Sequence, residues 1–331
     1  MPDKGGTRSC AIAHRCRLLL AVLFSTLLTL SAPAMAWNAA GHRLTAAIAW
    51  RAMDADTRQR VASLLAHHPD HALWGETALK KTRTQQEPGT ANDPGYAAFL
   101  EASTWPDDIK RDQRFFDDGE AATPLLPGFT DMARHRDWHY VDYPLDAPPT
   151  VAASGELALR LPVAMHTLAD RQRPASERAI ALAWLIHLVA DAHQPLHTAS
   201  RFDADGHGDE GGNRQWIEDP FNPRRSSMSL HAYWDDLPGP PWLRGPALER
   251  AVDAMAGALT NTEAKAAAPG SPAQWIAESH RLAKTVVYAG IDGEVPEISR
   301  AYNTRALQTA RDRVALAGQR LGQLLGLLLR D

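Results

Sequence analysis

The chain has 331 residues, of which 44% are hydrophobic and 22% are charged, proportions typical of globular proteins. Its 23 prolines and 22 glycines follow no period, which excludes a collagen-like fibre. The formal net charge is −4 and like charges form no long block, which excludes a polyelectrolyte tail that binds nucleic acid through bulk charge.

Residues 1–36 have the pattern of a secretory signal peptide. Three arginines between residues 8 and 17 form a basic region, residues 18–30 are an apolar run, and residues 34–36 (Ala-Met-Ala) match the small-x-small cleavage pattern. The alternative is an uncleaved membrane anchor, but the apolar run is shorter than the ~20 residues that a membrane span needs. We therefore expect an exported protein, periplasmic or secreted, that has no membrane span and begins at Trp37.

The rest of the chain predicts a mainly α-helical protein, because apolar residues recur at three- and four-residue intervals. No internal repeat and no linker divides it, so we expect a single helical domain over residues 37–331. The best strand candidate is residues 213–218. Helices are expected at residues 43–53, 57–66, 156–170, 178–192, 247–259, 275–287 and 298–329.

Two long segments, residues 89–128 and 201–240, are rich in Gly, Asp, Pro and Arg and are expected to be irregular. Loops of this length in a compact domain usually serve the function of the protein. We therefore expect these two segments to contribute active-site loops.

Both cysteines precede residue 37, so the expected mature chain has neither a thiol nor a disulfide. A chain of this length can bury a large core without disulfides. Bound metal is a second source of stability, because metal held only by the folded state adds to the free energy of unfolding.

A dense group of potential metal ligands lies between residues 187 and 197. His187 and Asp191 are four residues apart, so on a helix both project from one face. A proline two residues before His197 ends that helix and lets His197 return to the same region. His231 and Asp235 repeat the four-residue spacing. Imidazole and carboxylate are ligands that zinc prefers, and together these residues predict a metal site.

At this point the sequence resembles a known family, the zinc-dependent single-strand-specific nucleases of fungi and plants (nucleases S-one and P-one), which belong with the bacterial zinc phospholipases C. Five motifs support the resemblance, and they run from the expected mature N-terminus to residue 235. The motifs are Trp37-Asn-Ala-Ala-Gly-His42, Trp105-Pro-Asp107, Trp138-His139-Tyr140-Val141-Asp142, the segment from His187 to His197, and the segment from His231 to Asp235.

The resemblance implies a mainly α fold of the zinc phospholipase C and P-one nuclease type that binds three zinc ions, with Asp191 bridging two of them. Nitrogen and oxygen ligands suit zinc in a hydrolytic, non-redox role, since zinc lowers the pKa of a bound water to near neutrality. The implied ligand sets are Asp107, His139, His187 and Asp191 for the first ion, His197, His231 and Asp235 for the second, and the amine and carbonyl of Trp37 with His42 and Asp191 for the third.

The same resemblance implies roles in catalysis and substrate binding. Asp107 would also orient the attacking water, and Lys110 would neutralise charge that develops on the phosphate. Tyr140 would stack on a nucleobase and Asp142 would contact the edge of that base. The alternatives are a solvated surface lysine at 110, a core aromatic at 140, and a carboxylate at 142 that only supports a ligand.

We therefore expect an exported endonuclease that hydrolyses single-stranded DNA and RNA to 5′-nucleotides and also acts as a 3′-nucleotidase. We expect a monomer with no obligate protein partner. One alternative is a zinc-dependent phospholipase C, which would need an apolar, membrane-facing rim around its active site. The loop at residues 205–219 is acidic and polar instead. Another is a non-catalytic periplasmic zinc-binding protein, although structural zinc sites are usually rich in cysteine.

Overall fold

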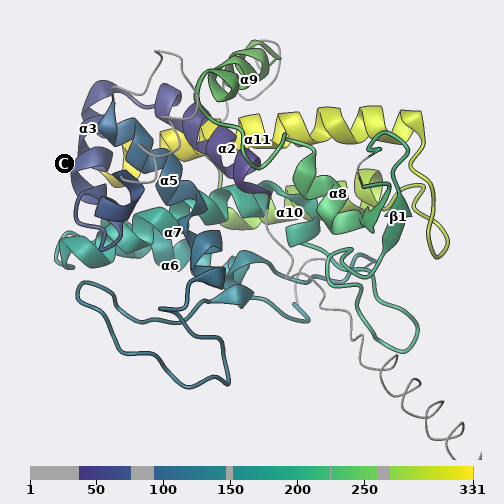
Figure 1. Cartoon of the computed structure of the whole chain (residues 1–331), viewed down its shortest axis with the longest axis horizontal. Coiled ribbons are helices and arrows are strands. Elements are labelled where there is room, and N and C mark those ends of the chain that lie inside the picture. Colours follow the sequence, from purple (N-terminus) through teal and green to yellow (C-terminus); the bar gives the residue numbers. More distant parts are fainter. Residues whose placement is uncertain (1–36, 76–92, 147–151, 224, 259–268, 331) are drawn as a thin grey trace, which may run out of the picture. The chain divides into compact units, whose positions relative to one another are not determined.

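The computed structural model of this protein is mainly helical, as the sequence predicts (Figure 1). Among the described residues, two short strands form the one sheet. The expected signal peptide, residues 1–36, lies outside the described residues. The structure describes residues 37–75, 93–146, 152–223, 225–258 and 269–330.

Two helices from opposite ends of the described chain, α2 (Ala39–Ala52) and α11 (Arg300–Leu328), pack against each other (Figure 1). The side chain of Asn38 caps α2 by accepting a hydrogen bond from the backbone N–H of Ala40, the second residue of the helix. At Gly318 of α11, an added Cβ atom would lie only 2.6 Å from the Cβ of Ile48. The missing side chain therefore allows the two helix backbones to approach closely.

The central helix is α7 (Ala175–His193), which packs against α6 (Leu157–Ala169) and α10 (Pro272–Leu282). Every residue from 179 to 193 is buried, as expected of a helix that is apolar on all sides. The helix ends before Pro195, which opens the short 3₁₀ helix η3 (Pro195–His197). The predicted turn before His197 is therefore confirmed.

The prediction of an irregular segment over residues 89–128 is wrong for helix α5 (Pro94–Asp108), which packs against α2, α3 and α7. Asp93 caps α5, and Pro94 occupies the first turn, where a missing N–H costs no hydrogen bond. Pro106 lies near the other end of the helix. Burial along α5 is nearly continuous, so the amphipathic period that identifies a helix from sequence is absent.

The second segment that was expected to be irregular, residues 201–240, contains three short elements. Strands β1 (Trp216–Glu218) and β2 (Ser227–Ser229) pair antiparallel, and β1 lies within the strand candidate of residues 213–218. Helix α8 (Leu230–Asp236) follows β2 directly, and the Ser229 hydroxyl caps it. The hairpin therefore fixes where α8 begins.

The remaining helices frame this core. Ser271 and Gln274 form a capping box at the start of α10, which begins three residues before the helix expected from residue 275. In the part of the chain that the structure describes, no helix combines the length and the apolar character needed to span a membrane. The other elements are α3 (Ala55–Leu65), η1 (Ile109–Arg111), η2 (Arg136–His139), α9 (Gly245–Ala258) and η6 (Ala283–Val287), the last a π-helical turn.

Candidate metal centre

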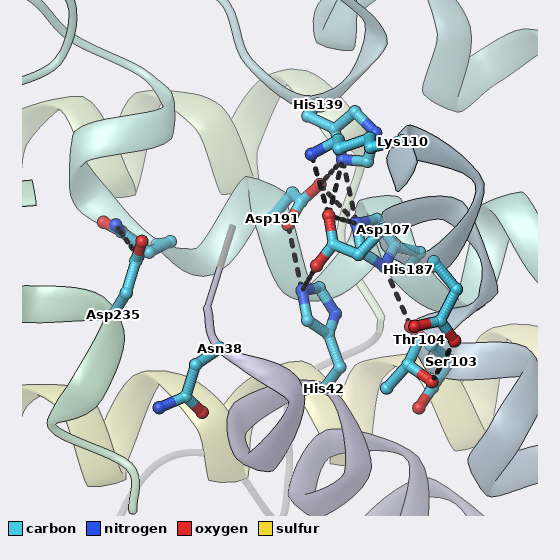
Figure 2. Close-up of polar contacts among 12 residues, drawn as sticks. Asn38, His42, Ser103, Thr104, Asp107, Lys110, His139, His187, Asp191 and Asp235 are labelled. Atoms are coloured by element: carbon cyan, nitrogen blue, oxygen red, sulfur yellow. Dashed lines mark hydrogen bonds and ion pairs between the residues drawn. The ribbon is translucent and has the colours of Figure 1, made fainter. Parts of the chain in front are cut away.

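The eight histidine and aspartate side chains expected to bind zinc come from α2, α5, α7, α8, η2 and η3, and all are buried, with exposed fractions of 5% or less. Figure 2 shows several of them converging around Asp191. Among these eight side chains, three sets have potential ligand atoms within 4.8 Å of one another: His42, Asp107 and His187; His139, His187 and Asp191; and His197, His231 and Asp235.

The first group surrounds the carboxylate of Asp191. The Oδ2 atom of Asp191 lies 3.2 Å from His187 Nε2 and 3.2 Å from His139 Nδ1, and these two ring nitrogens are 2.9 Å apart. Asp107 Oδ1 lies 3.8 Å from each of the same nitrogens. The four side chains that the family resemblance assigned to one ion are therefore together.

His42 approaches the same group from α2. Its Nε2 atom lies 3.5 Å from Asp191 Oδ1 and 3.9 Å from Asp107 Oδ2. The imidazole of His42 stacks on that of His187, with ring centroids 3.8 Å apart. The two carboxylate oxygens of Asp191 thus face different histidines, an arrangement compatible with a bridging carboxylate.

Trp37 is fully buried at the start of α2. An added Cβ at Gly41 would lie 2.7 Å from the Cβ of Trp37, so the glycine allows this tryptophan to fold over the first turn of the helix. The backbone N–H of Asn38 donates to the carbonyl of Asp235 at 3.2 Å. The expected mature N-terminus therefore lies against α8, which carries the second group of ligands.

The second group joins η3 to α8. The rings of His197 and His231 have centroids 5.1 Å apart, and His231 Nε2 lies 3.4 Å from Asp235 Oδ2. Gln194 donates from Nε2 to Asp235 Oδ1 at 2.9 Å, and its Oε1 accepts from the backbone N–H of Leu196 at 2.6 Å. Gln194 therefore turns the other oxygen of Asp235 toward the two histidines.

Backbone carbonyls set the orientation of three imidazoles. Nδ1 of His187 donates to the Ser103 carbonyl at 2.8 Å, Nδ1 of His197 to the His139 carbonyl at 2.7 Å, and Nδ1 of His231 to the Gly211 carbonyl at 2.7 Å. Because a carbonyl only accepts, each Nδ1 carries the proton and each Nε2 presents a lone pair to its group. Carbonyl partners of this kind commonly orient histidine ligands of metals.

Several buried polar atoms in both groups have no hydrogen-bond partner among the described residues. Leaving such atoms unpaired costs ~1–3 kcal/mol each, so a cluster of them calls for another partner. Nitrogen and oxygen lone pairs from separate elements that face common points are the donor set that zinc prefers. The residues therefore fit a zinc centre. The atoms are both ring nitrogens of His42, Oδ2 of Asp107, Nε2 of His139, Oδ1 of Asp191 and Nε2 of His197.

Burial governs the electrostatics of the cluster. It is the largest cause that lowers the pKa values of His42, His139 and His197 well below normal, so these rings are neutral, as metal ligands must be. Burial also raises the pKa of Asp191 to about 6 and raises the pKa of Asp235 well above its usual value. A cation in the cluster would stabilise both carboxylates in their charged form.

Lys110 is buried and donates from Nζ to Asp107 Oδ1 at 2.7 Å. It is therefore not the solvated surface lysine that the sequence left as an alternative. Burial alone raises the pKa of Asp107, but the nearby charge of the Lys110 ammonium opposes burial, and the pKa of Asp107 lies below normal. Lys110 thus keeps Asp107 ionised at the edge of the first group.

The two residues expected to bind the base lie on the segment that follows His139. Tyr140 is half-buried, so it is neither a fully buried core residue nor freely exposed. Both carboxylate oxygens of Asp142 have donors within the protein, the hydroxyls of Ser154 at 2.6 Å and Ser200 at 2.5 Å. Burial raises the pKa of Asp142. Asp142 therefore ties this segment to the chain that follows η3.

His193 and Gln194 are functionally placed residues that the sequence did not identify. His193 is fully buried, and its Nε2 accepts a hydrogen bond from Arg320 at 3.0 Å. Arg313 donates to the His193 carbonyl at 3.2 Å, and Ser279 donates to the preceding carbonyl at 2.6 Å. These contacts cap the end of α7 immediately after Asp191. The signal for Gln194 is its position between two ligands, at the residue where α7 ends.

A comparison with protein families gives a match that covers nearly the whole chain. The family model described as S1/P1 Nuclease matches residues 37–330. A comparison with curated proteins finds no match. The matched region includes every element of the candidate metal centre.

Proposed function

The chain belongs to the S1/P1 nuclease family, and from this premise we propose that it hydrolyses single-stranded DNA and RNA to 5′-nucleotides and also removes the phosphate of 3′-nucleotides. The family supports a nuclease function and is zinc-dependent. The observation that carries the proposal is the convergence of eight buried histidines and aspartates, several with unpaired lone pairs, from six separate elements. Such a set suits metal-assisted hydrolysis of a phosphodiester.

We assign three zinc ions to these residues. When bound, zinc supplies a Lewis acid and lowers the pKa of the water it holds. Support for the bridging role of Asp191 comes from its two oxygens, which face His42 on one side and His139 with His187 on the other. The assigned sets are Asp107, His139, His187 and Asp191; His197, His231 and Asp235; and Trp37 through its amine and carbonyl, with His42 and Asp191.

Asp107 and Lys110 then act together in the reaction. Asp107 orients the attacking water through its carboxylate, which the Lys110 ammonium keeps ionised. The positive charge of Lys110 also counters the negative charge that develops on the phosphate. The short contact between them fixes both groups before substrate binds.

Tyr140 and Asp142 are proposed to bind the nucleobase. Stacking contributes ~1–3 kcal/mol per base and requires an unpaired base, which favours single strands without a preference for one base. The half-buried ring of Tyr140 supports a stacking role. Each carboxylate oxygen of Asp142 accepts from one serine hydroxyl and has a second lone pair, which would accept from the base edge.

Export is part of the proposal. Removal of residues 1–36 would free the amine of Trp37, whose pKa near 8 allows coordination at neutral pH. An additional residue ahead of Trp37 would convert this amine into an amide nitrogen, which is a poor ligand. Cleavage would therefore complete the third zinc set in the periplasm or outside the cell.

Metal analysis combined with hydrolysis assays tests the proposal. The purified mature protein is expected to contain three zinc ions and to cleave single-stranded DNA and RNA faster than duplex DNA. Hydrolysis of phosphatidylcholine without nuclease activity would instead identify a phospholipase C, and zinc without either activity would identify a structural zinc protein.

A matched pair of variants strengthens this test. His187→Ala removes a proposed ligand that is four residues from Asp191. His207→Ala removes an exposed histidine that is four residues from Asp203, with the two side chains 3.4 Å apart. Loss of zinc and activity is expected only for His187→Ala, and equal effects of both substitutions would contradict the assignment.

A further inference from the structure

A cavity of about 250 Å³ lies outside the metal centre, between the side chains of α5, α6 and α7 and the segment that precedes η2. Figure 1 shows these three helices next to one another. None of the nine proposed zinc ligands lines this cavity. The cavity is therefore a separate site, although its wall residue Trp184 contacts the proposed ligand His139 with ring centroids 5.4 Å apart.

Five aromatic side chains are among the residues that line it. Trp138 and Trp184 lie with ring centroids 4.8 Å apart and a tilt of 55°, and Trp105 stacks on Phe129 at 6.5 Å. Phe115 meets Phe129 edge to face at 5.6 Å. The cavity is therefore bounded by ring faces and ring edges, the surfaces that pack best against another aromatic ring.

The size of the cavity limits its occupant. An apolar cavity of about 150 Å³ is large enough for benzene. A volume of about 250 Å³ therefore suits one or two fused rings. Val163 of α6 is an exposed apolar residue of the lining, at 47%, and we take the mouth to lie there, so a longer molecule would extend into solvent beside it.

The charged residues around the cavity are already paired with one another. Arg173 lies 3.2 Å from Glu177, and His135 lies 2.8 Å from Asp131. Arg160 is held by Glu156 at 2.5 Å and packs over the ring of Trp138. Because both arginines already have carboxylate partners, an anionic ligand would have to compete with a carboxylate for either of them. The lining therefore favours an uncharged molecule.

We propose that this cavity is a binding site for a neutral, planar aromatic molecule of one or two fused rings. The base of a nucleoside and an indole share this chemistry. The ring would lie against Trp184 and the edge of Trp138, because His135 stacks on Trp138 and Arg160 packs over it, and the ring's own edge would face Val163.

Two substitutions on α6 distinguish this site from the rest of the surface. Val163→Trp places an indole across the mouth of the cavity from an exposed position, so the core is unchanged. Leu159→Trp is the matched control, because Leu159 lies one turn earlier on the same helix, is 59% exposed, and does not line the cavity. Both variants are expected to unfold at the temperature of the parent protein.

Calorimetric titrations with indole and with adenosine measure the affinity. We expect saturable binding of at least one of them, weakened about tenfold or more by Val163→Trp and changed less than about twofold by Leu159→Trp. Binding of indole alone would identify a non-nucleotide aromatic as the ligand, and binding of adenosine alone would identify a nucleoside. Binding of neither, equal effects of the two substitutions, or tighter binding of hexanol than of either aromatic would overturn the proposal.

Discussion

Replacing Gln194 by methionine tests whether a buried amide controls the second group of ligands. Gln194 is fully buried, and its side chain pairs both with Asp235 Oδ1 and with the backbone N–H of Leu196. Methionine has a similar shape but makes neither hydrogen bond. The substitution leaves Asp235 Oδ1 and the Leu196 N–H unpaired, and each unpaired buried group costs ~1–3 kcal/mol. The zinc-free variant should therefore lose about 2–6 kcal/mol of its free energy of unfolding. Removing the group that orients a ligand predicts zinc affinity about 10–100-fold lower.

Urea unfolding of the chelator-treated protein measures the first effect, and zinc competition with a chromogenic chelator measures the second. Tyr302→Phe is the control, since the buried Tyr302 hydroxyl donates to the Val287 carbonyl and accepts from the Trp234 indole N–H but contacts no proposed ligand. This control also leaves two buried polar groups unpaired, so it is expected to lose about 2–6 kcal/mol of stability and to keep its zinc affinity. The reasoning is refuted if Gln194→Met binds zinc as tightly as the parent protein, or if Tyr302→Phe weakens zinc binding to the same extent.

Four further outcomes are expected. Chelation of the metal should lower the melting temperature and abolish hydrolysis together, so unchanged calorimetric melting would contradict a structural role for zinc. Asp191→Ala should lose more than one zinc ion by elemental analysis and His42→Ala about one, and equal losses would argue against a bridging carboxylate. One extra methionine before Trp37 should remove about one zinc ion and most activity, whereas equal zinc content would contradict ligation by the amine. Burial lowers the pKa of His68 to about 3, so on acidification the unfolded state binds this proton before the folded state does. The free energy of unfolding should therefore fall as the pH drops below about 6.5, by ~2 kcal/mol at pH 5. Urea titrations at about pH 6.5 and pH 5 should show a smaller loss for His68→Asn.

The helices that the sequence predicts correctly are those with a local signal. The spacing of apolar residues predicts α10 to within a few residues of its start, and Pro195 predicts the end of α7. Helix α5 was missed because its buried residues follow one another and two prolines suggest a turn. Nothing local distinguishes such a helix from a loop, because its packing against α2, α3 and α7 decides its structure.

In the candidate site, the ligand side chains could be predicted from the sequence, but the groups that orient them could not. Side chains that bear chemistry are visible in a sequence, and the spacing of His187 and Asp191 places them on one face of a helix. The groups that orient them are backbone carbonyls, such as those of Ser103 and Gly211, and any residue type has a carbonyl. Only the fold shows which carbonyl faces which ring. The burial of Lys110 likewise depends on how α5 and η1 pack, so the sequence around Lys110 was also compatible with a surface lysine.

The character of α7 explains why the centre is built around this helix. A helix buried on every side places His187 and Asp191 in a region of low polarity, where isolated polar groups are costly and attraction to a cation is strong. Burial there raises the pKa of Asp191 to about 6, so the helix alone does not favour the charged carboxylate. Arg313 and Ser279 bind the carbonyls just beyond Asp191 and hold that end of the helix in place. Cations among the convergent ligands would offset the cost of burial and join α2, α5, α7 and α8. Because residues 37–331 contain no cysteine, we infer that the same ions would stabilise the fold and carry out the chemistry.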